Sequence, residues 1–378
     1  MKPAHGRILV VDDDPAMLRA VERILAPRNE VRSFTSGEEA LAAFRAAPFD
    51  VAVVDVRMPK MDGFELTRAL RALQPRTEVI LVTGSITDLD EKMIRAIEER
   101  AFYFITKPFS KAVLTSLVAW CLEMQRLGEE RDDLIRRLTE DLERARRFQQ
   151  ALLPQGLPRA IGPVRAAAAW VSCEAVGGDL FDIVPLGPDR ALLAVADVAG
   201  HGVAAALLTG MVKTAMGRSF QERTDLAGAA RAVIELLAPL RQSRVVTLFL
   251  ALVERGTGTL HYLNAGHPPA VISRPGAAPR LLPATTPLLA YGIDMGSEPV
   301  AAAAFAPGDR LAIYSDGLYE IRDPAGAELG RERMVRLLAD HPGPLEATVA
   351  AAMEATRRHA AGRPPDDDLT LLIAERVG

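Results

Sequence analysis

The sequence is poor in cysteine and contains no long apolar run. Its 378 residues include two cysteines, Cys121 and Cys173, which are too few for a disulfide framework and favour a reducing compartment. No apolar run approaches the ~18 residues that a membrane-spanning helix needs. The formal charge of −4 gives no excess of positive charge for binding nucleic acid or an anionic membrane. These absences predict a cytoplasmic protein that binds neither.

The first third of the chain has the pattern of a doubly wound α/β fold. Short apolar runs at 8–11, 51–54, 79–82 and 102–105 alternate with amphipathic stretches such as 15–26 and 88–99. Continuous apolar runs of this kind suit strands that are covered on both faces. We therefore expect residues 1–121 to form an α/β domain with a five-stranded parallel sheet, and its functional site at the carboxyl ends of the strands.

A charged helical segment follows. Fifteen of the 29 residues in 122–150 are charged, and none is proline. Leu127, Leu134 and Phe148 share one heptad position, which Asp141 interrupts, and another is shared by Leu138, Ala145 and Leu152. Two such positions are typical of the narrow apolar seam of a two-stranded coiled coil. The pattern predicts a helical linker over 122–153 and a homodimer through it. The alternative is a single solvated helix that lies on a neighbouring domain.

The remaining residues, 154–378, have the pattern of an α+β domain. Apolar strand-like runs such as 191–196 and 245–253 are divided by glycine and proline turns. Helical patterns accompany them at 203–217 and 344–360. Because strands and helices do not strictly alternate, we expect packed β-sheets flanked by helices. The whole chain is thus predicted to be a multi-domain protein.

Polar side chains stand where the predicted parallel strands end. Asp12 and Asp13 follow the first strand, and the third, fourth and fifth strands end at Asp55, Thr83 and Lys107. Because these ends meet at one edge of the sheet, the three carboxylates need a hard cation such as Mg²⁺. A lysine and a hydroxyl at the same edge suit the oxygens of a phosphoryl group, with Asp55 as the nucleophile.

Four motifs at these strand ends resemble the receiver domain of two-component response regulators: VVDDDP (10–15), VVDVRMPKMDG (53–63), LVTGS (81–85) and TKPF (106–109). The resemblance implies that a histidine kinase or a phosphotransfer protein phosphorylates one aspartate in the presence of Mg²⁺. By this resemblance, Asp12 and Asp13 are the acidic pair, and Asp55 is the phosphoacceptor and a metal ligand. The carbonyl of Arg57 is a further metal ligand. Thr83 provides the switch hydroxyl, and Lys107 is the family's lysine.

The last domain has four clusters that combine aspartate with glycine or with further aspartates. They are VGGDLFD (176–182), ADVAGHG (196–202), YSDGLYE (314–320) and PDDDLT (365–370). Taken singly, each is typical of a turn or a solvated cap. Together, carboxylates from four segments indicate a site for two Mg²⁺ or Mn²⁺ ions, which would lower the pKa of a shared water and hold a phosphate.

In this order the clusters resemble metal-dependent serine/threonine phosphatases related to protein phosphatase 2C, in the bacterial SpoIIE branch. NAGHPP (264–269) and QQALLP (149–154) are also typical of that branch. The resemblance implies that Asp179 and Asp197 are catalytic metal ligands, joined by the carbonyl of Val198, Asp316 and Asp367. Asp368 is either an outer residue or, if the register shifts by one, the ligand in place of Asp367.

Other residues near these clusters are open to two interpretations. Asp182 is either an outer metal ligand or a turn residue. His201 is either a general acid or, as we favour, a structural residue at the start of a helix. His267 is expected to be structural. Arg165 is a candidate for the arginine with which larger relatives hold phosphate.

Together the two resemblances imply a response regulator whose output is a phosphatase controlled by phosphorylation of Asp55, with activation as the expected direction. The implied substrate is a phosphorylated STAS-type anti-sigma factor antagonist in a partner-switching pathway. The alternative is a non-catalytic adaptor with a phosphatase-like fold that binds a sigma-factor regulator or delivers a sigma factor to proteolysis. All four aspartates are present, which favours the enzyme.

Overall fold

The computed structural model describes residues 5–84, 103–200, 202–221, 225–274, 276–340 and 343–377. The chain forms two compact units, residues 1–138 and 139–378. The boundary between them lies within one long helix, so the domain limits expected near residues 121 and 153 stay predictions. Within the described ranges, no helix has both the length and the apolar character needed to cross a membrane.

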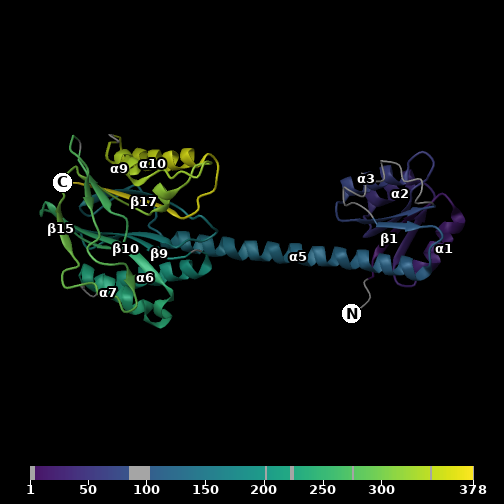
Figure 1. Ribbon diagram of the computed structural model, residues 1–378, viewed down its shortest axis with the longest axis horizontal. Helices are drawn as coiled ribbons and strands as arrows, with labels where there is room; N and C mark the ends of the chain where they lie inside the picture. Colours follow the sequence, from purple (N-terminus) through teal and green to yellow (C-terminus); the bar gives the residue numbers. More distant parts are fainter. Residues whose placement is uncertain are drawn as a thin grey trace. The chain divides into compact units, whose positions relative to one another are not determined.

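Unit 1 contains a five-stranded parallel sheet in the order β2-β1-β3-β4-β5. The strands are β1 (Arg7–Val11), β2 (Glu30–Phe34), β3 (Val51–Asp55), β4 (Glu78–Thr83) and β5 (Tyr103–Thr106). Helices α2 (Gly37–Ala46) and α3 (Gly63–Leu73) pack on one face, and α1 (Pro15–Leu25) and the start of α5 pack on the other (Figure 1). The predicted α/β doubly wound fold is confirmed. The helix expected at 88–99 lies outside the described residues.

Helix α5 (Lys111–Leu152) continues without a break from unit 1 into unit 2. Its first turns bury Leu114, Val118 and Cys121 in the core of unit 1. Beyond residue 126 its apolar side chains are mostly exposed, and Leu134 has an exposed fraction of 58%. Ion pairs between residues three or four positions apart stabilise this solvated stretch. The helix ends two residues before Pro154, as the sequence predicts.

Unit 2 contains two six-stranded antiparallel sheets. The first has the order β15-β11-β10-β9-β8, with β14 paired to β10. Its strands are β8 (Asp179–Pro185), β9 (Arg190–Val198), β10 (Val245–Glu254), β11 (Thr259–Ala265), β14 (Leu289–Ala290) and β15 (Ala301–Ala304). The second has the order β13-β12-β16-β17-β7-β6. Its strands are β6 (Arg159–Ile161), β7 (Val164–Val171), β12 (Ala270–Ser273), β13 (Arg280–Leu282), β16 (Arg310–Tyr314) and β17 (Leu369–Arg376).

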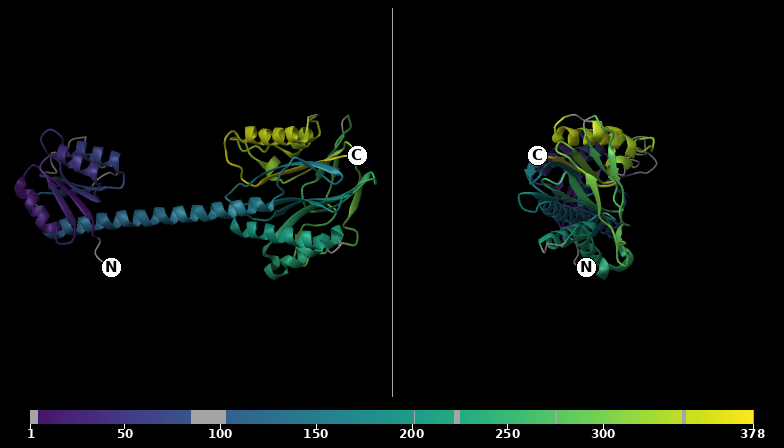
Figure 2. Two further views of the ribbon diagram at one scale, coloured as in Figure 1. Left: turned by 180° about the vertical axis from the view of Figure 1, so that it is seen from behind. Right: turned by 90° about the vertical axis from the view of Figure 1, so that its left-hand side faces the viewer.

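The helices of unit 2 cover the outer faces of the two sheets (Figures 1 and 2). Helices α6 (Val203–Gln221) and α7 (Leu226–Leu237) lie on the first sheet, and α7 continues into the 3₁₀ helix η1 (Ala238–Ser243). Helices α9 (Arg331–Asp340) and α10 (Leu345–Ala360) lie on the second sheet, next to the short α8 (Gly317–Glu320). One buried apolar cluster joins residues of both sheets with those of α6 and α7. The predicted packed sheets flanked by helices are therefore confirmed.

Candidate functional site

In unit 1 the predicted polar residues gather at the carboxyl edge of the parallel sheet. The Nζ atom of Lys107 lies 2.7 Å from Oδ2 of Asp12 and 2.6 Å from Oδ1 of Asp55. The second oxygen of Asp55 accepts a hydrogen bond from the backbone N–H of Arg57 at 2.9 Å. Thr83 is buried at the end of β4, and its carbonyl accepts from the N–H of Lys107. One lysine therefore links two strand ends, and a third strand end lies beside it.

The charge balance at this edge suits a cation. Burial raises the pKa of Asp55 and the charge of Asp12 adds to this, while the hydrogen bond and charge of Lys107 act in the opposite direction. Burial disfavours the charge of Lys107, but its hydrogen bonds to Asp12 and Asp55 raise its pKa overall. Asp13 is exposed next to Asp12. Three carboxylates against one ammonium group leave negative charge that a Mg²⁺ ion would balance, so the donor set fits the predicted metal.

In unit 2 the predicted aspartates come from both sheets and lie at one end of them. Asp179 opens β8 and stands opposite Asp197, near the end of β9, in the antiparallel register. Asp316 follows β16, and Asp367 precedes β17, which pairs with β16. The negative charge of Asp197 interacts with those of Asp316 and Asp367. Carboxylates from four separate segments are therefore close enough to interact, and we call this group the acidic pocket.

The glycines of the sequence clusters allow these segments to approach closely. A Cβ atom on Gly178 would lie 2.5 Å from the carbonyl oxygen of Val198, the predicted backbone ligand. A Cβ on Gly317 would lie 2.2 Å from the carbonyl oxygen of Asp368. Since real Cβ atoms do not approach oxygen so closely, glycine is required beside both Asp179 and Asp316.

Asp367 and Asp368 have different environments. Asp367 is exposed, whereas Asp368 is buried and both of its carboxylate oxygens accept backbone hydrogen bonds. The donors are the N–H groups of Cys173, at 2.8 Å, and Asp179, at 3.1 Å. This arrangement favours Asp368 as the residue that fixes the neighbouring loops and Asp367 as the ligand.

Burial and mutual repulsion raise the pKa values of two pocket carboxyls. Burial, followed by the charge of Asp197, raises the pKa of Asp179 well above its ordinary value. For Asp197, burial and the charges of Asp316, Asp367 and Asp368 raise the pKa to about 7. The hydroxyl of Thr370 donates to Oδ2 of Asp179 at 2.5 Å and opposes its shift. An all-oxygen donor set with uncompensated negative charge fits Mg²⁺ or Mn²⁺.

Sequence reasoning did not place Cys173 in this pocket. Its Sγ atom and one oxygen each of Asp367 and Asp368 lie within 4.8 Å of one another. Burial and the charge of Asp368 raise the pKa of the thiol to about 12. In the sequence it lies three residues before the VGGDLFD cluster (176–182).

Three other residues have partners that explain them structurally. Asp182 forms an ion pair with Lys213 of α6, with 2.6 Å between Nζ and Oδ2. Arg165 pairs with Glu346 of α10 at 2.6 Å. His267 is buried, its Nδ1 lies 2.9 Å from the hydroxyl of Thr247, and burial lowers its pKa to about 3. His201 lies outside the described residues.

The last turns of α5 contact the segment that leads into Asp179. The side chain of Gln149 is buried, and its Nε2 donates to the carbonyl of Gly177 at 2.7 Å. Its Oε1 accepts from the N–H of Gly177 at 3.1 Å. Both polar atoms of one side chain thus hold a residue two positions before Asp179. The motif QQALLP contains this glutamine, but the sequence does not show its partner.

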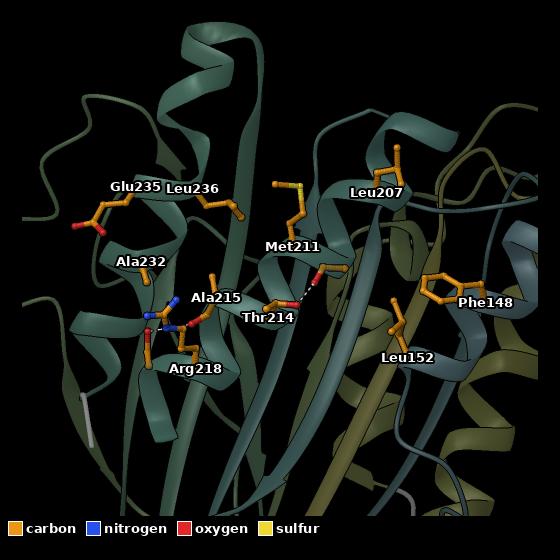
Figure 3. Close-up of a pocket in the computed structure, with 12 residues that line it drawn as sticks. Phe148, Leu152, Leu207, Met211, Thr214, Ala215, Arg218, Ala232, Glu235 and Leu236 are labelled. Carbon is orange, nitrogen blue, oxygen red and sulfur yellow. Dashed lines mark hydrogen bonds between the residues drawn. The ribbon is translucent and has the colours of Figure 1, made fainter. Parts of the chain in front are cut away.

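A groove of about 860 Å³ lies beside the same helix end, and none of the aspartates of the acidic pocket lines it. Figure 3 shows Phe148 and Leu152 of α5 on one side, Ala232, Glu235 and Leu236 of α7 on the other, and α6 residues between them. Phe148 and Leu207 have exposed fractions of 70% and 67%. The groove is therefore an open apolar surface, separate from the acidic pocket.

Two family models match the chain. The model for Stage II sporulation protein E (SpoIIE) matches residues 187–377, just over half of the chain. The model for the response regulator receiver domain matches residues 8–119. These ranges contain the two sets of strand-end residues described above, except for Asp179, which precedes the SpoIIE match.

Individual proteins are similar to parts of the chain. Protein IcfG of Synechocystis sp. is 25% identical over 280 residues, which cover 66% of this chain and 43% of IcfG. The chain thus spans less than half the length of this relative. The SiaA-PP2C domain of Pseudomonas aeruginosa has a TM-score of 0.57 at 23% identity, covering 65% of this chain and 98% of that domain. A structure of the PP2C phosphatase domain of Bacillus subtilis SpoIIE, with a fragment of its regulatory domain, has a TM-score of 0.50 at 22% identity, covering 57% and 62%.

Both solved structures show that unit 2 has the fold of a PP2C phosphatase domain. The matches and the topology of the two units agree on the organisation of the chain. This protein belongs to the SpoIIE family and has a response regulator receiver domain ahead of its SpoIIE domain.

Proposed function

We propose that this protein is a response regulator whose SpoIIE domain is a metal-dependent protein serine/threonine phosphatase. The main support is the acidic pocket, in which Asp179, Asp197, Asp316 and Asp367 lie together at the end of two sheets. A degenerate adaptor has no need for these residues, and their repulsion destabilises the metal-free fold. Completeness of the set therefore favours catalysis.

In this proposal Asp179, Asp197, Asp316, Asp367 and the carbonyl of Val198 hold two Mn²⁺ or Mg²⁺ ions. When bound, such ions lower the pKa of a water molecule and attract phosphate oxygens. The chain itself fixes the ligands. Thr370 orients Asp179 through its hydroxyl, and Asp368 positions the backbone on both sides of it. In the receiver domain, Asp12, Asp13, Asp55 and the carbonyl of Arg57 hold Mg²⁺.

The family likeness suggests the partners. A histidine kinase or phosphotransfer protein would phosphorylate Asp55, and the substrate would be phosphoserine or phosphothreonine on a STAS-type anti-sigma factor antagonist. We place the protein in the cytoplasm, where such partners occur.

Helix α5 provides a route by which phosphorylation of Asp55 would control the pocket. Its first turns belong to the core of unit 1, and its last turns hold Gly177 through Gln149. Leu127, Leu134 and Leu138 are exposed along the predicted seam. We propose that this seam forms a homodimer and that phosphorylation activates the enzyme by changing how α5 packs.

The decisive experiment is Mn²⁺-dependent hydrolysis of p-nitrophenyl phosphate by the wild type, Asp316→Asn and Asp189→Asn. Asp189 lies in the β8–β9 turn, at the opposite end of β9 from Asp197, and is the matched control. We expect the wild type and the control to be active and Asp316→Asn to lose its activity. Inactivity of all three folded proteins at saturating Mn²⁺ would contradict the phosphatase and favour the adaptor.

Control by the receiver domain needs a separate test. Acetyl phosphate is expected to label the wild type but not Asp55→Asn, and to raise the hydrolysis rate of the wild type alone. Equal rates with and without labelling would contradict the regulation. Sedimentation would test the dimer, because substitution of Leu134 by aspartate should shift the protein to a monomer.

A further inference from the structure

Arg244 lies beside the loop that follows Asp197 in unit 2. It immediately precedes β10, which pairs with β9 so that Thr247 stands opposite Asp197. The N–H of Ala199, two residues after Asp197, donates to the carbonyl of Val245 at 3.0 Å. The Nη1 atom of Arg244 donates to the carbonyl of Ala199 at 3.1 Å. The guanidinium group is therefore held against the loop that continues from Asp197.

The glycines of this loop show which residues lie near the guanidinium group. A Cβ atom on Gly200 would lie 2.8 Å from Nη1 of Arg244. The carbonyl oxygen of the same glycine lies 3.0 Å from the position that a Cβ on Gly178 would occupy, and that of Val198 lies 2.5 Å from it. Arg244 and Gly178, which precedes Asp179, thus both lie close to Gly200, three residues after Asp197.

The charge of Arg244 is not used by the pocket carboxylates. Among the residues that the structure describes, none forms an ion pair with Arg244, and its side chain donates to the neutral carbonyl of Ala199. A guanidinium group has five N–H donors, and this bond uses one of them. Arg244 is half-buried, so its other donors are partly screened from solvent.

Such a group suits a phosphate monoester. A guanidinium group binds phosphate oxygens with two parallel hydrogen bonds, and these bonds are stronger where water is partly excluded. The carbonyl of Ala199 fixes the orientation of the group before an anion arrives, which reduces the entropy lost on binding. Arg165, the arginine that the sequence offers for this role, is paired with Glu346 instead.

We propose that Arg244 binds the phosphate group of the substrate at the acidic pocket. The inference rests on the proposed phosphatase function and adds the residue that recognises the phosphate. Arg244 would also bind the phosphate that hydrolysis releases, so inorganic phosphate is a suitable probe of this binding. The competing explanation is that Arg244 only positions the loop that contains Val198 and Ala199.

The test measures phosphate binding, kinetics and metal binding on the full chain. The variants are Arg244→Gln and Arg244→Lys, with Arg165→Gln as the matched control. Calorimetry with Mn²⁺-loaded protein should show that Arg244→Gln binds inorganic phosphate about tenfold to a hundredfold more weakly, as expected for loss of a charged hydrogen-bonding group. The KM for p-nitrophenyl phosphate should rise by a similar factor. Arg244→Lys should restore part of both, and Arg165→Gln should match the wild type.

The outcomes separate this inference from the proposed function. If Arg244→Gln weakens Mn²⁺ binding but leaves phosphate affinity unchanged at saturating Mn²⁺, Arg244 is a loop-positioning residue and the inference is wrong. It is also wrong if the wild type does not bind phosphate. If the wild type binds phosphate in an Arg244-dependent way but hydrolyses nothing, the inference stands and the phosphatase proposal fails. If Arg244→Gln hydrolyses the substrate with an unchanged KM, the phosphatase proposal stands and the inference fails.

Discussion

Metal binding to the acidic pocket should release protons near pH 6. With a pKa raised to about 7, the carboxyl of Asp197 is about 0.9 protonated at pH 6 and about 0.1 protonated at pH 8. Asp179, whose pKa is also raised, adds to this number. Because divalent cations bind ionised carboxylates, Mn²⁺ has to displace these protons. We expect at least about 0.9 proton per protein at pH 6, and the share from Asp197 to fall to about 0.1 at pH 8.

The same shift makes the metal-free protein less stable at higher pH. The pKa of Asp197 is higher in the folded state than in the unfolded chain, so folding favours its protonated form. The stabilisation is complete below the unfolded pKa of about 4 and is lost as the pH rises through 7. A pKa shift of Asp197 from 3.8 to about 7 corresponds to about 4 kcal/mol in the free energy of unfolding. Thermal unfolding of metal-free protein should therefore occur at a lower temperature at pH 8 than at pH 5.

Calorimetric titration with Mn²⁺ in buffers of different ionisation enthalpy measures the proton number directly. Asp189→Asn should release as many protons as the wild type, because Asp189 is exposed and lies at the other end of β9. Asp197→Asn should release about one fewer and bind Mn²⁺ more weakly. A proton number near zero for the wild type at pH 6 would show that the pocket carboxyls are already ionised, and the reasoning from burial and repulsion would be refuted.

Three further predictions concern single residues of unit 2. Gln149→Ala should destabilise the protein by about 2–4 kcal/mol in urea unfolding, since it leaves the buried N–H and C=O of Gly177 without their partner, while Gln150→Ala should have little effect. Gly178→Ala should weaken Mn²⁺ binding in calorimetry, because its Cβ would displace the carbonyl of Val198. Alkylation of Cys173 in folded protein at pH 8 should be slow, because a thiol with a pKa of about 12 is almost fully protonated, and rapid alkylation would contradict that shift.

The receiver site could be predicted from sequence because its geometry follows from strand order. In a parallel doubly wound sheet all carboxyl ends meet at one edge, so locating the strands also locates Asp12, Asp55 and Lys107. The two ion pairs of Lys107 are a direct consequence of that arrangement. The helix expected at 88–99 lies outside the described residues and stays a prediction.

The pocket of unit 2 could be predicted only in part. The sequence predicts strands at 191–196 and 245–253, which correspond to β9 and β10. It does not predict β7, because the sequence VRAAAAWV is rich in alanine, which favours helices. The sequence does not predict β8 either, because Asp182 interrupts its run of apolar residues. Residue types identified the carboxylates, whereas their supports depend on contacts between distant segments. Thr370 and Asp179, for example, are 191 positions apart.

Those supports explain why Asp367 and Asp368 could not be distinguished by sequence. Adjacent residues at the start of a strand point in different directions, and only the tertiary structure shows which one is buried. Asp368 fixes the backbone of Asp179 from the second sheet, while Gln149 fixes Gly177 from α5. The segment 177–179 is thus held from two sides. Of these two contacts, the one from α5 belongs to the helix that also enters the core of unit 1. Under the proposed regulation, it is the contact through which phosphorylation of Asp55 would act on the pocket.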